Sequence, residues 1–153
     1  MDVKPTLQVI DAAKIKSRPG VTRGQTLKPI VGHDERPTDR VRTALATYEP
    51  GTVEQLHWHP IEACYYVISG HATVRNFEGK EFEVGPGSII YAPPGIAGAH
   101  EWEVKESLEL LDIRATNETN KKIQYTVDKK TKRSYIDLED LAYRDAISFK
   151  SHY

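Results

Sequence analysis

Alternating apolar and polar positions divide the middle of the chain into short segments that predict β-strands. Val41–Tyr48 and Ala63–Ser69 are rich in β-branched and aromatic residues, and Glu81–Val84 alternates strictly. The other predicted strands of this region are Val53–His59, His71–Phe77, Ser88–Ala92, Ala99–Val104 and Ser107–Arg114. Turn residues separate the segments at intervals of roughly 8–12 residues, so residues 41–114 predict about seven short strands in an all-β sandwich or barrel.

The segments on either side of this region carry weaker patterns. Thr6–Ile10 predicts a short strand, and Gln25–Gly32 predicts an edge strand because its proline cannot donate a hydrogen bond to an interior ladder. Ile123–Val127 predicts one more strand. Asp137–Ser148 has apolar residues at helical spacing behind an aspartate that is a suitable N-cap, which predicts a short C-terminal helix.

Composition places the chain among globular proteins. Its 153 residues suit a single domain, and 39% are hydrophobic and 28% charged. The formal net charge of −1 argues against nucleic acid or an anionic membrane surface as a partner, because both require a strongly positive field. The lone Cys64 excludes an internal disulfide framework and a cysteine-rich zinc site. We expect a cytoplasmic protein, by default and not from a targeting signal.

The most informative residues are two histidines separated by one position, followed by a glutamate. His57 and His59 lie on a predicted strand, where side chains two residues apart point to the same face. Two imidazoles on an inward face can begin a divalent metal site. Glu62 and His100 are the available further ligands, and Gln55 is a spare candidate because it has the parity of His57.

Two motifs in this region resemble those of the cupin superfamily. In the first, Gly51 stands five residues before His57-Trp58-His59, and Gly70 ends the following strand. In the second, Gly87 precedes Pro93-Pro94-Gly95 by five residues, and His100 follows after four residues where the family has two. The resemblance covers residues 41–114. It implies a double-stranded β-helix (jelly-roll barrel) within a single domain over residues 1–153, and a metal held by three histidines and one glutamate.

The first motif departs from the family at the glutamate. Two residues separate His59 from Glu62, where the family has three or four. A shift of one residue on a regular strand turns a side chain to the opposite face. Glu62 therefore reaches a metal only if residues 60–61 form a bend or bulge, and otherwise three histidines form the site. The expected ligands are His57, His59, Glu62 and His100.

Residues after Glu62 should supply the wall of the site. One parity of that strand faces inward, so either Tyr65 or Tyr66 is expected to orient a substrate. We expect His33, His71 and His152 to be solvated. Nitrogen and oxygen ligands without a thiolate suit Fe, Mn, Ni, Co or Zn, and the sequence does not choose among these ions.

The resemblance implies a metal-dependent enzyme that acts on a small oxygenated organic substrate, with a dioxygenase (an oxidoreductase) as the leading reaction and a lyase or isomerase as other forms. Two alternatives stay open: a non-catalytic metal-containing sensor, and a metal-free isomerase that uses histidine as acid and base. The family also implies a homodimer, for which we expect contacts at Leu27–Val31 and at residues 137–148.

Overall fold

The computed structural model describes residues 6–33, 35–115, 124–139 and 142, and its regular structure is almost entirely β. The described strands are β1 (Arg18–Pro19), β2 (Gln25–Val31), β3 (Val41–Tyr48), β4 (Val53–Trp58), β5 (Ala63–Ser69), β6 (Ala72–Asn76), β7 (Glu81–Val84), β8 (Ile89–Ala92), β9 (His100–Val104), β10 (Leu108–Ala115), β11 (Tyr125–Val127) and β12 (Ser134–Tyr135). Two 3₁₀ turns, η1 (Ala12–Lys14) and η2 (Ile96–Gly98), complete these elements. None of the described helices has the length and apolar character needed to cross a membrane.

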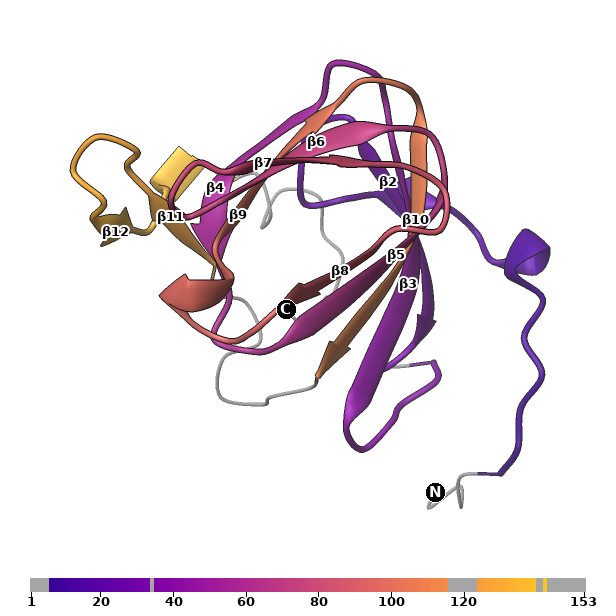
Figure 1. Cartoon of the computed structure of the whole chain (residues 1–153). Helices are drawn as coiled ribbons and strands as arrows, with labels where there is room; N and C mark the ends of the chain where they lie inside the picture. The colour runs from indigo at the N-terminus through magenta and orange to yellow at the C-terminus, as the bar shows by residue number, and fades with distance from the viewer. Residues whose placement is uncertain (1–5, 34, 116–123, 140–141, 143–153) are drawn as a thin grey trace.

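Two antiparallel six-stranded sheets face each other and form a double-stranded β-helix (Figure 1). One sheet has the order β1-β2-β3-β10-β5-β8, and the other has the order β12-β11-β4-β9-β6-β7. The strand and barrel predictions for residues 41–114 are therefore confirmed, because β3 to β9 fall in the predicted segments and β10 extends only one residue beyond its segment. Strands β7 and β8 lie at the ends of their sheets, so the two sheets meet there without a ladder between them.

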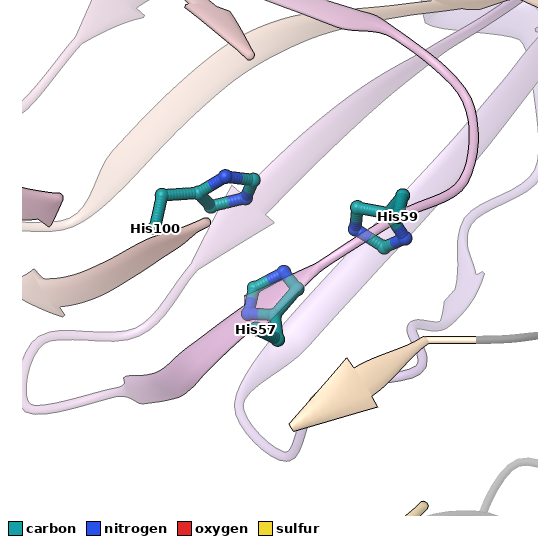
Figure 2. A group of neighbouring side chains, drawn as sticks. All are labelled: His57, His59 and His100. Atoms are coloured by element: carbon teal, nitrogen blue, oxygen red, sulfur yellow. The ribbon is translucent and has the colours of Figure 1, made fainter. Parts of the chain in front are cut away.

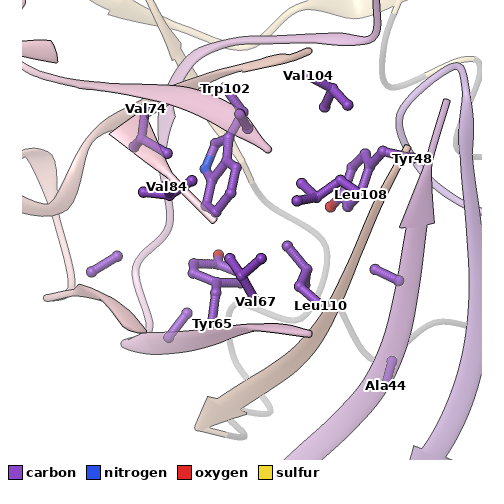
Figure 3. Close-up of a cluster of buried hydrophobic side chains, with 14 of the residues drawn as sticks. Ala44, Tyr48, Tyr65, Val67, Val74, Val84, Trp102, Val104, Leu108 and Leu110 are labelled. Carbon is purple, nitrogen blue, oxygen red and sulfur yellow. The ribbon is translucent and has the colours of Figure 1, made fainter. Parts of the chain in front are cut away.

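The main hydrophobic core fills the space between the two sheets. Alternation produces it: every second residue of β10 is buried, beginning with Leu108 and Leu110. Tyr65 from β5 and Trp102 from β9 meet from opposite sheets, with ring centroids 5.6 Å apart (Figure 3). The core reaches the polar groups of the barrel, because the Tyr65 and Trp102 ring centroids lie 5.6 and 6.4 Å from that of His100.

The flanking segments differ from the sequence predictions. Thr6–Ile10 forms no strand, and Leu7 and Val9 are 95% and 96% exposed. Strand β2 lies inside its sheet, because the two-residue β1 pairs with Thr26 and Leu27 and ends before Pro29. Pro29 has no backbone N–H to donate, and because β1 does not extend to Pro29, no hydrogen bond to β1 is lost there.

The residues after β10 form a small hairpin of β11 and β12 beside β4. The predicted strand is present from Tyr125 on, and residue 123 lies outside the described residues. The short C-terminal helix is not confirmed, because most of residues 137–148 lie outside the described part of the chain. Asp137 accepts a hydrogen bond from the Glu139 backbone N–H over 3.0 Å, as an N-cap would.

Candidate metal centre

Three histidines from two strands converge inside the barrel (Figure 2). His57 lies on β4, His59 follows that strand directly, and His100 opens β9. The three side chains are buried, and the ring centroid of His57 lies 4.9 Å from that of His59 and 4.5 Å from that of His100. One candidate ligand atom from each ring lies within 4.8 Å of the other two.

A bulge in β4 determines which way its histidines point. Glu54 is paired with Trp102 on β9, whereas His57 is paired with His100, so β4 contains one residue more than β9 between these pairs. The extra residue breaks the simple alternation. Gln55 is exposed although His57 is buried, and the structure does not bring Gln55 to the histidines.

Backbone carbonyls fix the orientation and tautomer of two rings. The Nδ1 atom of His57 donates to the Gln55 carbonyl over 2.6 Å, and Nδ1 of His100 donates to the Gly98 carbonyl over 2.9 Å. A proton on Nδ1 leaves the lone pair of a neutral imidazole on Nε2. Burial, followed by the nearby His57, lowers the pKa of His100 to about 3. His100 is therefore neutral near pH 7, which is the form that binds a metal.

The donor set fits a divalent transition-metal ion. Imidazole nitrogens suit Zn, Cu, Fe, Co and Ni, and a hydrogen bond from Nδ1 to a carbonyl is the usual support for a metal-binding histidine. Within the described residues, the group that could hold an ion contains three histidines and no carboxylate. His57, His59 and His100 would hold the ion, and three protein ligands leave coordination positions for a substrate or water.

Glu62 lies outside this group. It precedes β5, its side chain is exposed, and its Oε2 accepts a hydrogen bond from the Tyr91 hydroxyl over 2.7 Å. That bond raises the pKa of Tyr91. The bend at residues 60–61 leads into Ala63, which is buried, so the preceding Glu62 faces outward.

The two tyrosines named from the sequence lie on opposite faces of β5. Tyr65 is buried, and its ring centroid is 5.6 Å from that of His100. Tyr66 is 43% exposed on the outer face. The inward parity of this strand is therefore that of Tyr65 and Val67.

The remaining histidines follow the prediction only in part. His71 is exposed and pairs with Glu106 over 3.1 Å. The prediction for His33 was wrong: this side chain is buried, and its Nε2 lies 3.3 Å from the Ile30 carbonyl. It packs where the chain folds back after β2, and burial lowers its pKa. His152 lies outside the described residues.

The sequence analysis missed Asn76, the direct partner of His100 on the neighbouring strand β6. Residues paired across a ladder share a face, so Asn76 lies beside the histidine group. Both residues border a cavity of about 520 Å³ at the gap between β7 and β8. The sequence shows that Asn76 has the same parity as the buried Val74. That Asn76 lies opposite His100 is known only from the pairing of β6 with β9.

Comparisons with known proteins agree with this fold. The family described as "Cupin domain" matches residues 44–114. The polyketide cyclase RemF from Streptomyces resistomycificus has a similar structure with a TM-score of 0.64 and 19% identity, covering 73% of this chain and 81% of that one. KdgF from Halomonas sp. has a TM-score of 0.62 and 20% identity, covering 73% and 96%. An RmlC-like cupin from Shewanella frigidimarina has a TM-score of 0.59 and 14% identity, covering 72% and 91%.

Residues 44–114 therefore match the cupin domain, and the barrel has the fold of the RmlC-like cupins to which it is similar. No curated protein matches its sequence. These three structures are each less than 25% identical to this chain, so they establish the fold, and the chemistry must be argued from the site.

Proposed function

We propose that this protein is a metal-dependent enzyme that acts on a small oxygenated organic substrate, with a dioxygenase reaction as its specific form. The observation that carries the proposal is the convergence of three buried histidines whose ligand atoms lie within 4.8 Å of one another. Burying three imidazoles at one point removes their hydration, which costs free energy, and coordination of a metal ion would compensate for that loss.

The residues around the histidines have separable roles in this proposal. His57, His59 and His100 hold the ion, which supplies Lewis acidity and, as iron, reactivity toward dioxygen. Tyr65 is buried with its ring centroid 5.6 Å from that of His100, and in this proposal it orients the substrate through its ring and hydroxyl group. Tyr66 and Glu62 have no such role because both are exposed on the outer side.

A homodimer is part of the proposal and is supported by the outer face of β5 and β8. Tyr66 and Ile68 on β5 and Ile89 and Tyr91 on β8 are each more than 40% exposed, and Tyr66 pairs directly with Ile89. Exposed apolar groups that gather on one face are typical of protein–protein contacts. Light scattering of the purified protein tests this part.

The enzymatic proposal is tested with the full chain reconstituted separately with Fe(II), Mn(II), Ni(II), Co(II) and Zn(II). Oxygen uptake and ultraviolet change are followed with a panel of diketones, catechols and β-hydroxy acids. Oxygen uptake with Fe(II) and one substrate class supports the dioxygenase. Turnover without oxygen uptake supports a lyase or isomerase, and metal binding without any turnover supports the sensor. Turnover by metal-free protein would instead favour acid–base chemistry by the histidines.

A further inference from the structure

The cavity of about 520 Å³ between β7 and β8 leads from the surface to His100. It lies where the two sheets end without a ladder between them. Its volume is within the range of small-molecule sites. The turn η2, which contains the two residues added to the second motif, forms part of its wall through Ala97 and Gly98.

The inward-facing side chains of this cavity are apolar. β6 and β7 contribute Val74, Phe82 and Val84, and β8 contributes Ile90 and Ala92. Val74 and Phe82 are paired across the ladder, and the ring of Phe82 is 43% exposed at the opening. Such a wall contacts a hydrocarbon or aromatic body and gives no polar partner to it.

The charged side chains at the cavity lie at its rim and are engaged elsewhere. Arg75 donates to Glu81, Glu101 and Glu103 over 2.9, 3.1 and 3.0 Å. Glu83 accepts a hydrogen bond from Thr73 over 2.8 Å. Both belong to the outward parity of their strands. These charged side chains therefore offer no cation along the apolar wall, and a carboxylate held against that wall would lose hydration without compensation.

Asn76 is the polar side chain beside His100. Its Oδ1 accepts a hydrogen bond from the Lys80 backbone N–H over 2.9 Å, which anchors the side chain in the turn between β6 and β7. The amide also has an NH₂ group with two donors. Asn76 is thus a positioned donor that lines an apolar cavity and is paired across the ladder with a candidate metal ligand.

We propose that this cavity binds uncharged carbonyl compounds with an apolar body, and that Asn76 selects them by donating a hydrogen bond from Nδ2 to the carbonyl oxygen. The apolar body lies between β7 and β8, and the carbonyl group points toward the three histidines. This inference names a substrate class for the proposed function. It rests on the proposed function only where it places the reacting end of the substrate at the histidine site.

The test uses the full ¹⁵N-labelled chain without metal and two probes of equal size and different charge, acetophenone and benzoate. Acetophenone is expected to shift the Asn76 side-chain amide signals and the backbone signals of Ala92 and Ala97. Benzoate is expected to bind at least ten-fold more weakly, because burying its charge is costly. Equal or tighter binding of benzoate, or acetophenone shifts confined to other parts of the chain, would overturn the proposal.

The variant Asn76→Asp isolates the donor. A carboxylate keeps the acceptor for the Lys80 N–H and removes the NH₂ group, so acetophenone should bind roughly 3- to 10-fold more weakly. Gln8→Glu is the matched control, because it makes the same amide-to-carboxylate change at an exposed residue outside the cavity. Unchanged binding in Asn76→Asp, or an equal loss in Gln8→Glu, would contradict the role of Asn76.

A second variant tests the cavity independently of Asn76. Ala97 is exposed at its wall, so Ala97→Trp fills the cavity without enlarging a core residue and should abolish acetophenone shifts. Retained acetophenone binding in this variant would overturn the proposal.

A separate experiment tests the metal site. Zn²⁺ is titrated into the unsubstituted protein, and binding is measured from the His57 and His100 ring signals. Failure of Zn²⁺ to bind defeats the metal proposal, whereas failure of the ketone preference defeats only this inference.

Discussion

His57 and His100 are direct partners across the β4–β9 ladder, and their ring centroids lie 4.5 Å apart. Without the bulge in β4, the pairing of Glu54 with Trp102 would continue so that Leu56 stood opposite His100. His57 would then face the outer side of the sheet. One additional residue in β4 thus places His57 of the first motif on the same face as His100 of the second.

This relationship predicts that both strands are needed for metal binding. His57→Ala and His100→Ala should each lower the affinity for Co(II) by at least 100-fold, because two imidazoles hold an ion much less tightly than three. Absorbance titration measures the affinity. His71→Ala is the control, since His71 is exposed and pairs with Glu106, and a comparable loss there would contradict the assignment.

Glu62 provides the sharpest test of the ligand number. Glu62→Gln should leave Co(II) affinity within about three-fold of the original, because the carboxylate faces outward and accepts a bond from Tyr91. Tyr91→Phe removes the same bond from the other side and should behave alike. A loss of affinity well beyond ten-fold in Glu62→Gln alone would show that this carboxylate turns inward when an ion is bound.

The adjacent tyrosines give a matched pair for the proposed substrate contact. Tyr65→Phe should lower kcat by roughly 10-fold or more while leaving metal affinity unchanged, because it removes the proposed substrate-orienting hydroxyl group and keeps the ring that lies 5.6 Å from that of His100. Tyr66→Phe should leave kcat unchanged, since that side chain is exposed on the outer face. Equal kcat values for the two variants would remove Tyr65 from the proposed mechanism.

Gly70 and Gly79 have the same backbone conformation but different surroundings, so substituting each one separates the cost of backbone strain from the cost of a steric collision. Gly70 and Gly79 have φ of 86° and 84°, a region that costs other residues about 1–2 kcal/mol. A Cβ at Gly70 would collide with the Ser107 carbonyl oxygen and lie 2.8 Å from the Leu108 Cα, whereas at Gly79 none of the described residues beyond the two chain neighbours has an atom within 4 Å.

Gly79→Ala should therefore lower the free energy of unfolding by about 1–2 kcal/mol, and Gly70→Ala by about 3 kcal/mol or more, because backbone must also move. Urea unfolding measures both. Equal losses would mean that the segment between β5 and β6 is free to move away from β10.

The central strands could be predicted because their sequence patterns are local. β3, β5 and β7 have the predicted bounds, since each combines strand-forming residues with flanking turn residues. The candidate ligands His57, His59 and His100 also followed from parity and from the resemblance to cupins. The structure brings these three together.

The remaining features depend on contacts between distant segments. The bulge that separates Gln55 from His57 is defined by pairing with β9, and the partnership of Asn76 with His100 is defined by pairing with β6. His33 is buried because the chain folds back after β2, which its polar neighbours do not reveal. Thr6–Ile10 has a strand pattern but gains no described partner strand, so local propensity alone did not decide its structure.

The metal content of the purified full chain tests the central claim most directly. Protein produced with Fe, Mn, Co, Ni and Zn in the medium and then desalted is compared, by elemental analysis, with the double variant His57→Ala/His100→Ala. We predict about one ion per chain in the unsubstituted protein and less than about one-tenth in the variant. Similar metal content in both proteins, or no metal in the unsubstituted chain, would contradict the assignment.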